Sequence, residues 1–388
     1  MNFPHIQTID DVLPALTGRE EFKIKHTPDY TAIDYNYVLP NTFDDPIRRE
    51  CRGLKFYPDG RIMARPFHKF FNLGEKPETR PEAIDIYQPH VVMEKFDGSM
   101  IHPALLLSNQ SRESVTFMTR MGLTDVACLA AAYIVKSQPW VIEWCIKMLL
   151  DGVTPIMEYT GPDNRIVVAY TEPQLTLLAC RQTISGDYLA AVNQREARRA
   201  EDGWRGPRAS PTGLITNIDR FIAATRALEN AEGYVIRFLD TGLMIKLKAD
   251  AYVLRHKAKD QIGLEKNALR VVLEGADDDM IPLLHETDAA ALRRYAADVR
   301  EVIGQLVVEV EAIVTAGALA ERKTFALDYV PRLPPLLKPI AFAGRDGKDV
   351  RAELIAHFLK RTSSGPDVAE LRKEAGLPTW TEFLSEPS

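Results

Sequence analysis

Short runs of alternating apolar and polar residues dominate the first two thirds of the chain and predict β-strands. Arg61–Arg65 alternates directly after the Pro58-Asp59-Gly60 turn. Tyr234–Phe238 and Leu243–Leu247 flank Asp240-Thr241-Gly242 and predict a β-hairpin. Further strands are predicted at Pro155–Tyr159, Arg165–Tyr170 and Leu175–Cys180.

Helical patterns interrupt these strands in the middle of the chain. The Ala-rich segment Thr124–Lys136 predicts a helix capped by Thr124, and a second helix is predicted from Trp140 to Leu150. The segment Val192–Pro211 is rich in Arg, Glu, Gly and Pro, which predicts a charged helix leading into a surface loop.

After Tyr252 the pattern changes to amphipathic helix. The periodicity is clearest from Asp288 to Ala316, where apolar residues recur every three or four positions. A connector punctuated by prolines at 331, 334, 335 and 339 follows, and another helix is predicted from Asp349 to Arg361. We therefore expect an α+β domain over residues 1–255 and an all-helical domain over residues 256–388.

Composition sets broad limits on these two domains. The chain has 388 residues, 46% of them apolar and 26% charged, as is ordinary for a globular protein with two cores. No membrane-length apolar stretch and no basic-then-apolar leader are expected. The net charge of −6 argues against nonspecific coating of nucleic acid but leaves room for a local basic groove. The four cysteines form no Cys-x-x-Cys pair, so we expect buried thiols in a reducing cytosol and no zinc site.

The run Val-Val-Met-Glu-Lys-Phe-Asp-Gly-Ser, ending at Ser99, places Lys95 at the end of an apolar strand and just before Asp97-Gly98. A lysine held rigidly there and partly desolvated can lose a proton and attack an electrophile. Asp-Gly lets backbone amides approach a phosphate or ribose closely. Taken alone, an Asp-Gly pair after a strand is more often just a hairpin turn.

Three further motifs follow in order: Met157-Glu158-Tyr159, Glu232-Gly233-Tyr234-Val235 and Lys246-Leu247-Lys248. With Lys95-Phe96-Asp97-Gly98-Ser99, they resemble the motifs of the covalent nucleotidyltransferases, which are the ATP-dependent RNA and DNA ligases and the mRNA capping enzymes. Lys246 and Lys248 are two apart on a predicted strand and share one face. That spacing is also typical of a solvated edge strand with protective lysines.

Sequence segments that flank these motifs distinguish between the RNA ligases, the DNA ligases and the capping enzymes. Arg52-Gly53, the run Arg65–Asn72 and the run Gly161–Val167 resemble the phage-type RNA ligase 1 family. The resemblance covers roughly the first 255 residues. It implies that residues 1–255 form a nucleotidyltransferase (adenylation) domain of antiparallel sheets with flanking helices.

The resemblance also implies roles for single residues. Lys95 would attack the α-phosphate of ATP, with Lys246, Lys248 and Glu232 as the other catalytic groups. Glu158 and Glu232 would bind ribose hydroxyls or a divalent cation, with Asp97 as a third metal contact or merely a turn former. The implied ATP- and AMP-binding residues are Tyr35, Arg52, Lys69, Phe71, Glu94, Lys95, Gly98, Arg120, Glu158, Glu232, Lys246 and Lys248.

Two of these positions carry qualifications. Arg120 stands where the family usually has lysine; arginine keeps the charge and adds a bidentate fork, so phosphate contact is retained as an expectation without an identical role. For Phe70 and Phe71, core packing is the competing interpretation, and we expect it to hold for at least one of the pair.

The activity implied is that of an ATP-dependent RNA ligase that uses Mg²⁺, or Mn²⁺ in its place. It would join 5′-phosphate and 3′-hydroxyl ends of single-stranded RNA, nicked tRNA included, through a lysine–AMP intermediate and an adenylylated 5′ end, as in RNA repair. A monomer without a membrane partner, in the cytoplasm (the host cytoplasm for a phage protein), is expected.

Three alternatives stay open at this point. A DNA ligase or a GTP-using capping enzyme shares the motifs, but both continue after the last lysine motif with a domain made of strands, whereas this chain predicts helices there. The third is a non-catalytic RNA-end-binding protein on the same fold. The intact Lys95, Glu158, Glu232, Lys246 and Lys248 argue against it.

Overall fold

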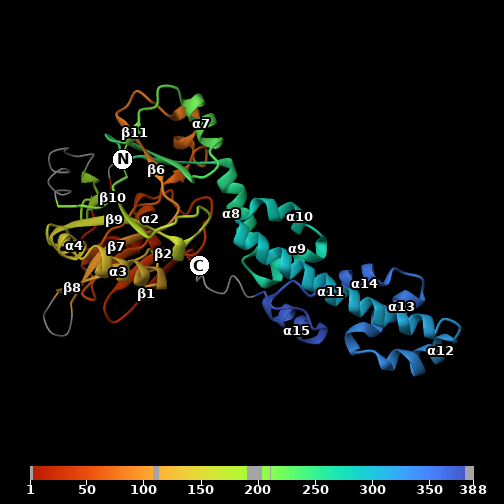
Figure 1. The fold of residues 1–388 in the computed structure, drawn as a ribbon. Helices are drawn as coiled ribbons and strands as arrows, with labels where there is room; N and C mark the ends of the chain where they lie inside the picture. Colours follow the sequence, from red (N-terminus) through yellow and green to blue (C-terminus); the bar gives the residue numbers. More distant parts are fainter. Residues whose placement is uncertain (1–2, 108–112, 190–202, 210, 381–388) are drawn as a thin grey trace. The chain divides into compact units, whose positions relative to one another are not determined.

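The computed structural model describes residues 3–107, 113–189, 203–209 and 211–380. The chain divides into two compact units, Met1–Val253 and Leu254–Ser388. In the described residues the first unit is α+β and the second is helical, which confirms the predicted fold class (Figure 1). None of the described helices is long and apolar enough to cross a membrane.

The N-terminal sheet of the first unit is an antiparallel meander. It consists of β1 (Phe22–His26), β2 (Thr31–Tyr35), β3 (Leu54–Phe56) and β4 (Ile62–Ala64), in that order. A buried apolar cluster that includes Ile33, Phe43 and Phe56 packs on it. The short helices η1 (Ile9–Asp11), α1 (Leu13–Leu16) and α2 (Pro46–Glu50) accompany this sheet.

The second sheet has the order β10-β9-β7-β8 and is antiparallel throughout. Its strands are β7 (Ser99–Leu107), β8 (Glu113–Met118), β9 (Val153–Thr160) and β10 (Gln174–Gln182). The helices α3 (Asp125–Ser137) and α4 (Trp140–Leu150) cover it (Figure 1). Both were predicted within one residue, and the Thr124 hydroxyl caps α3 by accepting from the Ala127 amide.

The third sheet carries the lysine motifs. Its order is β11 (Pro211–Gly213), β6 (His90–Lys95), β12 (Gly233–Phe238), β13 (Met244–Lys248) and β5 (Phe71–Asn72). All pairs are antiparallel except β13 with β5. The short helices η2 (Pro77–Thr79) and η3 (Pro81–Ala83) follow β5 in the chain, and α7 (Ile218–Arg226) precedes β12. Because β13 lies between two strands, its lysines do not belong to a solvated edge.

The register of the third sheet aligns the motifs. Gly233 on β12 is opposite both Lys95 on β6 and Lys248 on β13. Val235, two residues along, is opposite both Met93 and Lys246. Residues two apart share a face. Lys95, Lys246 and Lys248 therefore project from the same face of the sheet.

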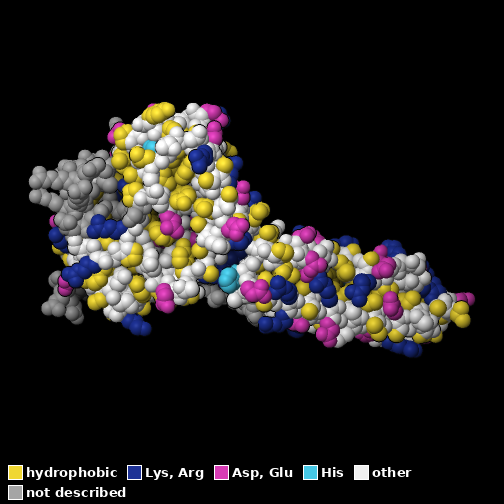
Figure 2. All heavy atoms as spheres, turned by 45° about the horizontal axis from the view of Figure 1, so that its top comes forward, with side chains coloured by type: hydrophobic (Ala, Val, Ile, Leu, Met, Phe, Trp, Pro, Cys, Tyr) yellow, Lys and Arg dark blue, Asp and Glu magenta, His cyan; other side chains and the backbone are white. Residues whose placement is uncertain are grey.

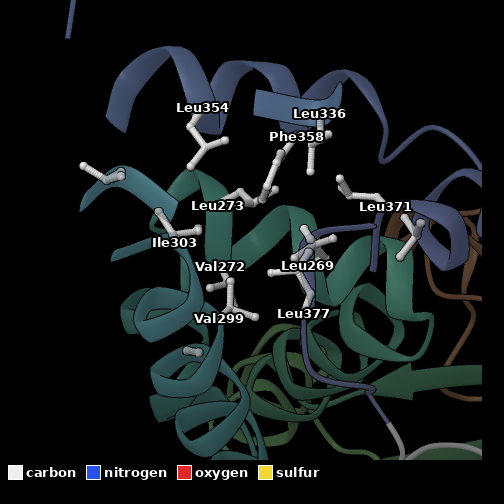
Figure 3. Close-up of a cluster of buried hydrophobic side chains, with 14 of the residues drawn as sticks. Leu269, Val272, Leu273, Val299, Ile303, Leu336, Leu354, Phe358, Leu371 and Leu377 are labelled. Carbon is white, nitrogen blue, oxygen red and sulfur yellow. The ribbon is translucent and has the colours of Figure 1, made fainter. Parts of the chain in front are cut away.

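The second unit contains helices packed around one long helix, α11 (Glu286–Ala316). The buried stripe of α11 includes Leu292, Val299 and Ile303, and Figure 3 shows Val299 and Ile303 in one cluster of buried side chains with Leu269, Phe358 and Leu371. The other α-helices are α8 (Asp250–Ile262), α9 (Glu265–Glu274), α10 (Asp277–Met280), α13 (Lys338–Arg345), α14 (Val350–Lys360) and α15 (Gly365–Ala375). On the face drawn in Figure 2, Lys and Arg are interspersed with Asp and Glu along this unit.

The proline-rich connector of the second unit is more ordered than predicted. It consists of short helical turns, α12 (Arg322–Thr324), the π-turn η6 (Phe325–Tyr329), η7 (Val330–Arg332) and η8 (Pro335–Leu337), while η5 (Ile281–Leu283) precedes α11. Pro339 lies in the first turn of α13, where its missing N–H leaves no hydrogen bond unmade.

Two further predictions are wrong, and one lies partly outside the described residues. Arg165–Tyr170 follows the 3₁₀ turn η4 (Pro162–Asn164) as a loop and forms no strand. Cys128 is exposed on α3, because this helix buries Ala127, Ala130 and Ile134 on another face. Of the helix and loop predicted over Val192–Pro211, positions 192–202 and 210 are outside the described residues.

Candidate active site

A cavity of about 240 Å³ lies in the first unit and is lined by residues of the second and third sheets. Most of its wall is apolar, and the polar side chains that line it are Arg52, Glu94, Lys95, Glu158, Lys246 and Lys248. A mostly apolar cavity with a few convergent charges is the usual form of a small-molecule site. The cavity thus joins residues from four separate sequence motifs.

Lys95 is held at this cavity by a buried carboxylate. The Lys95 Nζ donates to Glu232 Oε2 at 2.6 Å, and the Lys248 Nζ pairs with Glu232 Oε1 at 3.0 Å. The Glu232 side chain is only 3% exposed, whereas the Lys95 and Lys248 side chains are 22% and 31% exposed. One carboxylate therefore fixes two lysines, and both remain accessible from the cavity.

Lys246 lies on the same face of β13, with its Nζ 5.0 Å from the Phe70 ring centroid. Burial, together with the nearby charges of Lys69, Arg52 and Lys95, lowers the pKa of Lys246 to about 7. Several neighbouring positive charges and a partly apolar environment both favour the neutral form of the Lys246 amine. A polyanion that entered the cavity would reverse this balance and draw a proton onto Lys246.

Glu158 faces the same cavity from β9. Burial raises the pKa of Glu158 to about 7, against the opposing charge of Lys95, and the negative charge of Glu232 adds to the rise. A carboxylate that is destabilised in this way gains free energy from any cation or donor that enters the cavity.

Gly98 is required by close backbone approach. A Cβ atom at this position would lie 2.3 Å from the Tyr159 carbonyl oxygen, at a conformation that needs no positive φ. Any side chain at residue 98 would therefore force β7 away from β9, which pairs with it at Ser99 and Tyr159. Gly98 therefore allows the Lys95 motif to lie in contact with the motif that contains Glu158.

Asp97 is buried at 1% exposure and serves the scaffold. Its Oδ2 accepts from the backbone N–H groups of Val167 and Val168, both at 2.7 Å, and its Oδ1 accepts from the Tyr252 hydroxyl at 2.7 Å. These bonds explain why the segment Arg165–Tyr170 is no strand, since its amides donate to a carboxylate instead of a ladder. The structure does not place Asp97 among the residues that line the cavity.

Five of the predicted nucleotide-binding residues lie outside the cavity lining, and one of them is Glu232, which reaches the site through Lys95 and Lys248. Lys69 contacts the rings of both Tyr35 and Phe71 beside the N-terminal sheet. Arg120 pairs with Asp34 at 3.2 Å and lies over the Tyr35 ring. Phe71 is 2% exposed and belongs to the core, whereas its neighbour Phe70 lines the cavity. Core packing thus describes one of the two phenylalanines, as expected.

Sequence reasoning missed Tyr252 and much of the apolar lining. Tyr252 is buried, donates to Asp97, and has a raised pKa because of burial and the charges of Glu232 and Asp97. Its hydroxyl also bonds Glu232, so it links two motifs that are distant in sequence. Met244 could have been found by alternation from Lys246, but Phe67 and Met100 carried no comparable signal.

A family model described as RNA ligase matches residues 50–261, more than half of the chain, and spans Lys95, Glu158, Glu232 and Lys248. The chain belongs to the RNA ligase family. This confirms the resemblance seen in the sequence motifs.

Individual members of the RNA ligase family are similar over much of the chain. A candidate RNA ligase of Thermovibrio ammonificans is 30% identical over 256 residues, which are 65% of this chain and 64% of that protein. RNA ligase 1 of bacteriophage TS2126 is 27% identical over 292 residues, which are 71% of this chain and 69% of that protein. A solved archaeal ATP-dependent RNA ligase has a TM-score of 0.44 at 14% identity, covering 76% of this chain and 78% of that one.

The carboxylates of this RNA ligase family member could bind a divalent cation only together with oxygen atoms of a substrate. Within the described ranges, no three His, Cys, Asp or Glu side chains gather as a metal site, so Glu158, Glu232 and Asp97 do not form the expected trio. Mg²⁺ is usually bound by one or two carboxylates together with phosphate oxygens and water. Glu158, destabilised as an anion and lining the cavity, fits that role.

Proposed function

We propose that this protein is an ATP-dependent RNA ligase that joins a 5′-phosphate to a 3′-hydroxyl of single-stranded RNA. The observation that carries the proposal is Lys95, whose amine lies at the wall of the cavity in contact with the buried Glu232. Membership of the RNA ligase family supports it. Because the chain spans 64% of the Thermovibrio relative's length, activity and substrate are proposed for this chain on its own site.

In the first step the Lys95 Nζ attacks the α-phosphorus of ATP. A P–N bond forms, the P–O bond to the β-phosphate breaks, and pyrophosphate leaves. The amine must lose a proton to attack, and the Glu232 carboxylate 2.6 Å away is positioned to accept it. Lys248, paired with the other Glu232 oxygen, holds that carboxylate in place.

The triphosphate finds its counter-charges in the same cavity. Lys246 and Arg52 line it, and Lys246, with a pKa of about 7, takes up a proton when phosphate charge enters. Glu158 would hold a bound Mg²⁺ or Mn²⁺, which would supply further charge neutralisation. The apolar wall formed by Phe70, Met100 and Met244 suits the base.

In the second step AMP passes from Lys95 to the RNA 5′-phosphate, which forms a 5′–5′ pyrophosphate bond and restores the free amine. In the third step the 3′-hydroxyl attacks that phosphate, the phosphodiester forms and AMP leaves. Both steps need the same in-line geometry and the same cations. We propose nicked tRNA among the substrates, a role in RNA repair, a monomeric state and a cytoplasmic location, which is the host's for a phage protein.

The deciding experiment is incubation with α-labelled ATP and Mg²⁺, comparing the wild type with Lys95→Ala. Label retained on the denatured wild type and absent from the variant is the expected result. Lys23→Ala on the exposed side of β1 is the matched control and should label normally. Folded wild type that takes no label from ATP would contradict the proposal.

Adding labelled polymers then separates the alternatives. Sealing of 5′-phosphorylated RNA is expected, and sealing of nicked DNA only would instead indicate a DNA ligase. Labelling by GTP and not ATP would indicate a capping-type enzyme. Binding of RNA ends without any labelling would indicate a non-catalytic end-binding protein.

A further inference from the structure

An aromatic cage surrounds the ammonium group of Lys69. Its Nζ lies 5.3 Å from the Tyr35 ring centroid, 5.1 Å from Phe43 and 5.8 Å from Phe71. Each distance is within the range of a cation–π contact. Across the described ranges no carboxylate forms an ion pair with Lys69, so the rings are its partners.

The cage is rigid because its walls pack on one another. The Tyr35 and Phe43 rings meet edge to face at 5.0 Å, and Phe43 meets Phe71 at 6.2 Å. Phe43 is 1% exposed and Phe71 2% exposed, so both rings are fixed in the core of the N-terminal sheet. A lysine has a flexible four-carbon stem, and such a cage removes most of that freedom.

The position of the cage relates it to the cavity. Phe71 lies on β5, which pairs in parallel with β13 at Ile245, and Asn72 pairs with Lys246. The charge of Lys69 is the strongest of those that act on Lys246. Lys69 itself is outside the cavity lining, so its charge acts on the site from a distance, through Lys246.

We infer that Phe43 is a positioning residue that, with Tyr35 and Phe71, fixes the Lys69 ammonium near the strand pair β5–β13, and so strengthens binding of the ATP triphosphate. A carboxylate partner would hold Lys69 equally well but would cancel its charge. Neutral rings hold the ammonium and leave its field intact. The inference rests on the proposed adenylylation by ATP.

The test is a double-mutant cycle on self-adenylylation with Phe43→Leu and Lys69→Met, in which the half-saturating ATP concentration and the maximal rate are measured. Phe43→Leu alone should raise the half-saturating concentration about tenfold, with a smaller change in the maximal rate. In the Lys69→Met background the same substitution should change it less than about twofold, because the cation is already absent.

Phe22→Leu is the matched control. Phe22 belongs to the same core and meets the Phe43 ring edge to face at 6.1 Å, but it does not contact Lys69. It should lower thermal stability as Phe43→Leu does and leave the half-saturating ATP concentration unchanged. Equal effects of Phe43→Leu with and without Lys69, or an equal effect of Phe22→Leu, would overturn the inference.

If Phe43→Leu fails to fold, Phe43→Met replaces it in the same cycle, since methionine also removes the ring while its flexible side chain adapts to a core position. Failure of the proposed function is recognised separately, because the wild type would then take no label from ATP at all.

Discussion

Two glutamates of the first unit are each bridged by two cations, yet the two clusters serve different ends. Glu50 pairs with Arg65 at 3.1 Å and with Arg181 at 2.8 Å, and all three side chains are at most 1% exposed. Glu232 pairs with Lys95 and Lys248, whose amines reach the cavity. The chemistry of the pairs is similar, and their access to solvent and substrate is not.

The further hydrogen bonds of the cations explain why the two clusters differ in accessibility. Arg181 donates also to the carbonyls of Pro66 and Gly186, and Arg65 to those of Pro4 and Ile184. The two guanidinium groups thereby hold together three backbone segments, at Pro4, at Pro66 and at Ile184 with Gly186. Lysine offers no planar fork, so Lys95 and Lys248 keep donors that a substrate can use. The Glu50 cluster, whose arginines are hydrogen-bonded to backbone carbonyls, therefore has a structural role. The Glu232 cluster, whose lysines reach the cavity, is suited to a chemical one.

The largest expected effect comes from breaking the scaffold cluster with Glu50→Gln. Two buried guanidinium groups would then lack a counter-charge, and we expect the free energy of unfolding to fall by about 3–5 kcal/mol. Urea denaturation at pH 7 measures it. Asp59→Asn, which breaks an exposed pair with Arg61, is the control and should change stability by less than about 1 kcal/mol. Equal losses in the two variants would show that burial does not set the value of these pairs.

The same substitution in the other cluster, Glu232→Gln, should act on the reaction instead. Without the carboxylate, Lys95 loses its proton acceptor and Lys248 its anchor, and we expect lysine–AMP formation to slow about 10²–10⁴-fold. Rapid-quench labelling measures this rate. The melting temperature should fall much less than in Glu50→Gln, and a comparable fall would mean that both clusters are scaffold.

A third prediction contrasts the pH dependence of Glu50 and Glu158. Burial would raise the pKa of Glu50, but Arg181 and Arg65 outweigh it and lower the pKa to about 2, from 4.5. Stability from Glu50 is therefore complete above pH 4.5 and lost as pH falls toward 2. The pKa of Glu158 is raised from 4.5 to about 7, so the folded state binds its proton more tightly, and stability falls as pH rises from 4.5 to 7.

Glu158→Gln should remove the second trend and leave the first. We expect the variant to be more stable than the wild type by about 1–3 kcal/mol at pH 8 and equal to it at pH 4.5. Thermal melts across pH 2–8 measure both trends. A variant no more stable than the wild type at pH 8 would contradict the unfavourable burial of this carboxylate.

The smallest effect is expected at Tyr252→Phe. Its hydroxyl donates to Asp97 at 2.7 Å, and its loss should cost about 1–2 kcal/mol of stability. Urea denaturation is again the measurement, with Tyr133→Phe on α3 as the control. No measurable loss would show that Asp97 is held by the Val167 and Val168 amides alone.

The sequence predicted those parts of the site that are local. Each motif lies next to a strand whose alternation is visible, so the shared face of Lys246 and Lys248 followed from their spacing. Thr124 marked the start of α3 because a cap is a contact between near neighbours. The helical unit was predicted because its periodicity persists over a helix as long as Glu286–Ala316.

Contacts between distant segments were not predictable in this way. Arg165–Tyr170 has the apolar composition of a strand, but the Asp97 carboxylate, 70 positions from Val167, takes its amides. The Lys69 cage needs Phe43, which belongs to no motif and forms its wall only once the N-terminal sheet packs. Cys128 was misplaced because composition does not say which face of a helix is inward.

The row that aligns Lys95, Gly233 and Lys248 also orders events during synthesis. Glu232 is 137 positions beyond Lys95, and Tyr252 is 155 positions beyond Asp97. A nascent chain therefore exposes the strand that carries Lys95 long before Glu232 and Tyr252, which contact this strand and the turn after it, have been translated. Contacts of such sequence separation form slowly. The pairing of Lys95 with Glu232 therefore forms only after the start of β12 has emerged from the ribosome, and the Asp97–Tyr252 hydrogen bond only after the first residues of α8 have followed.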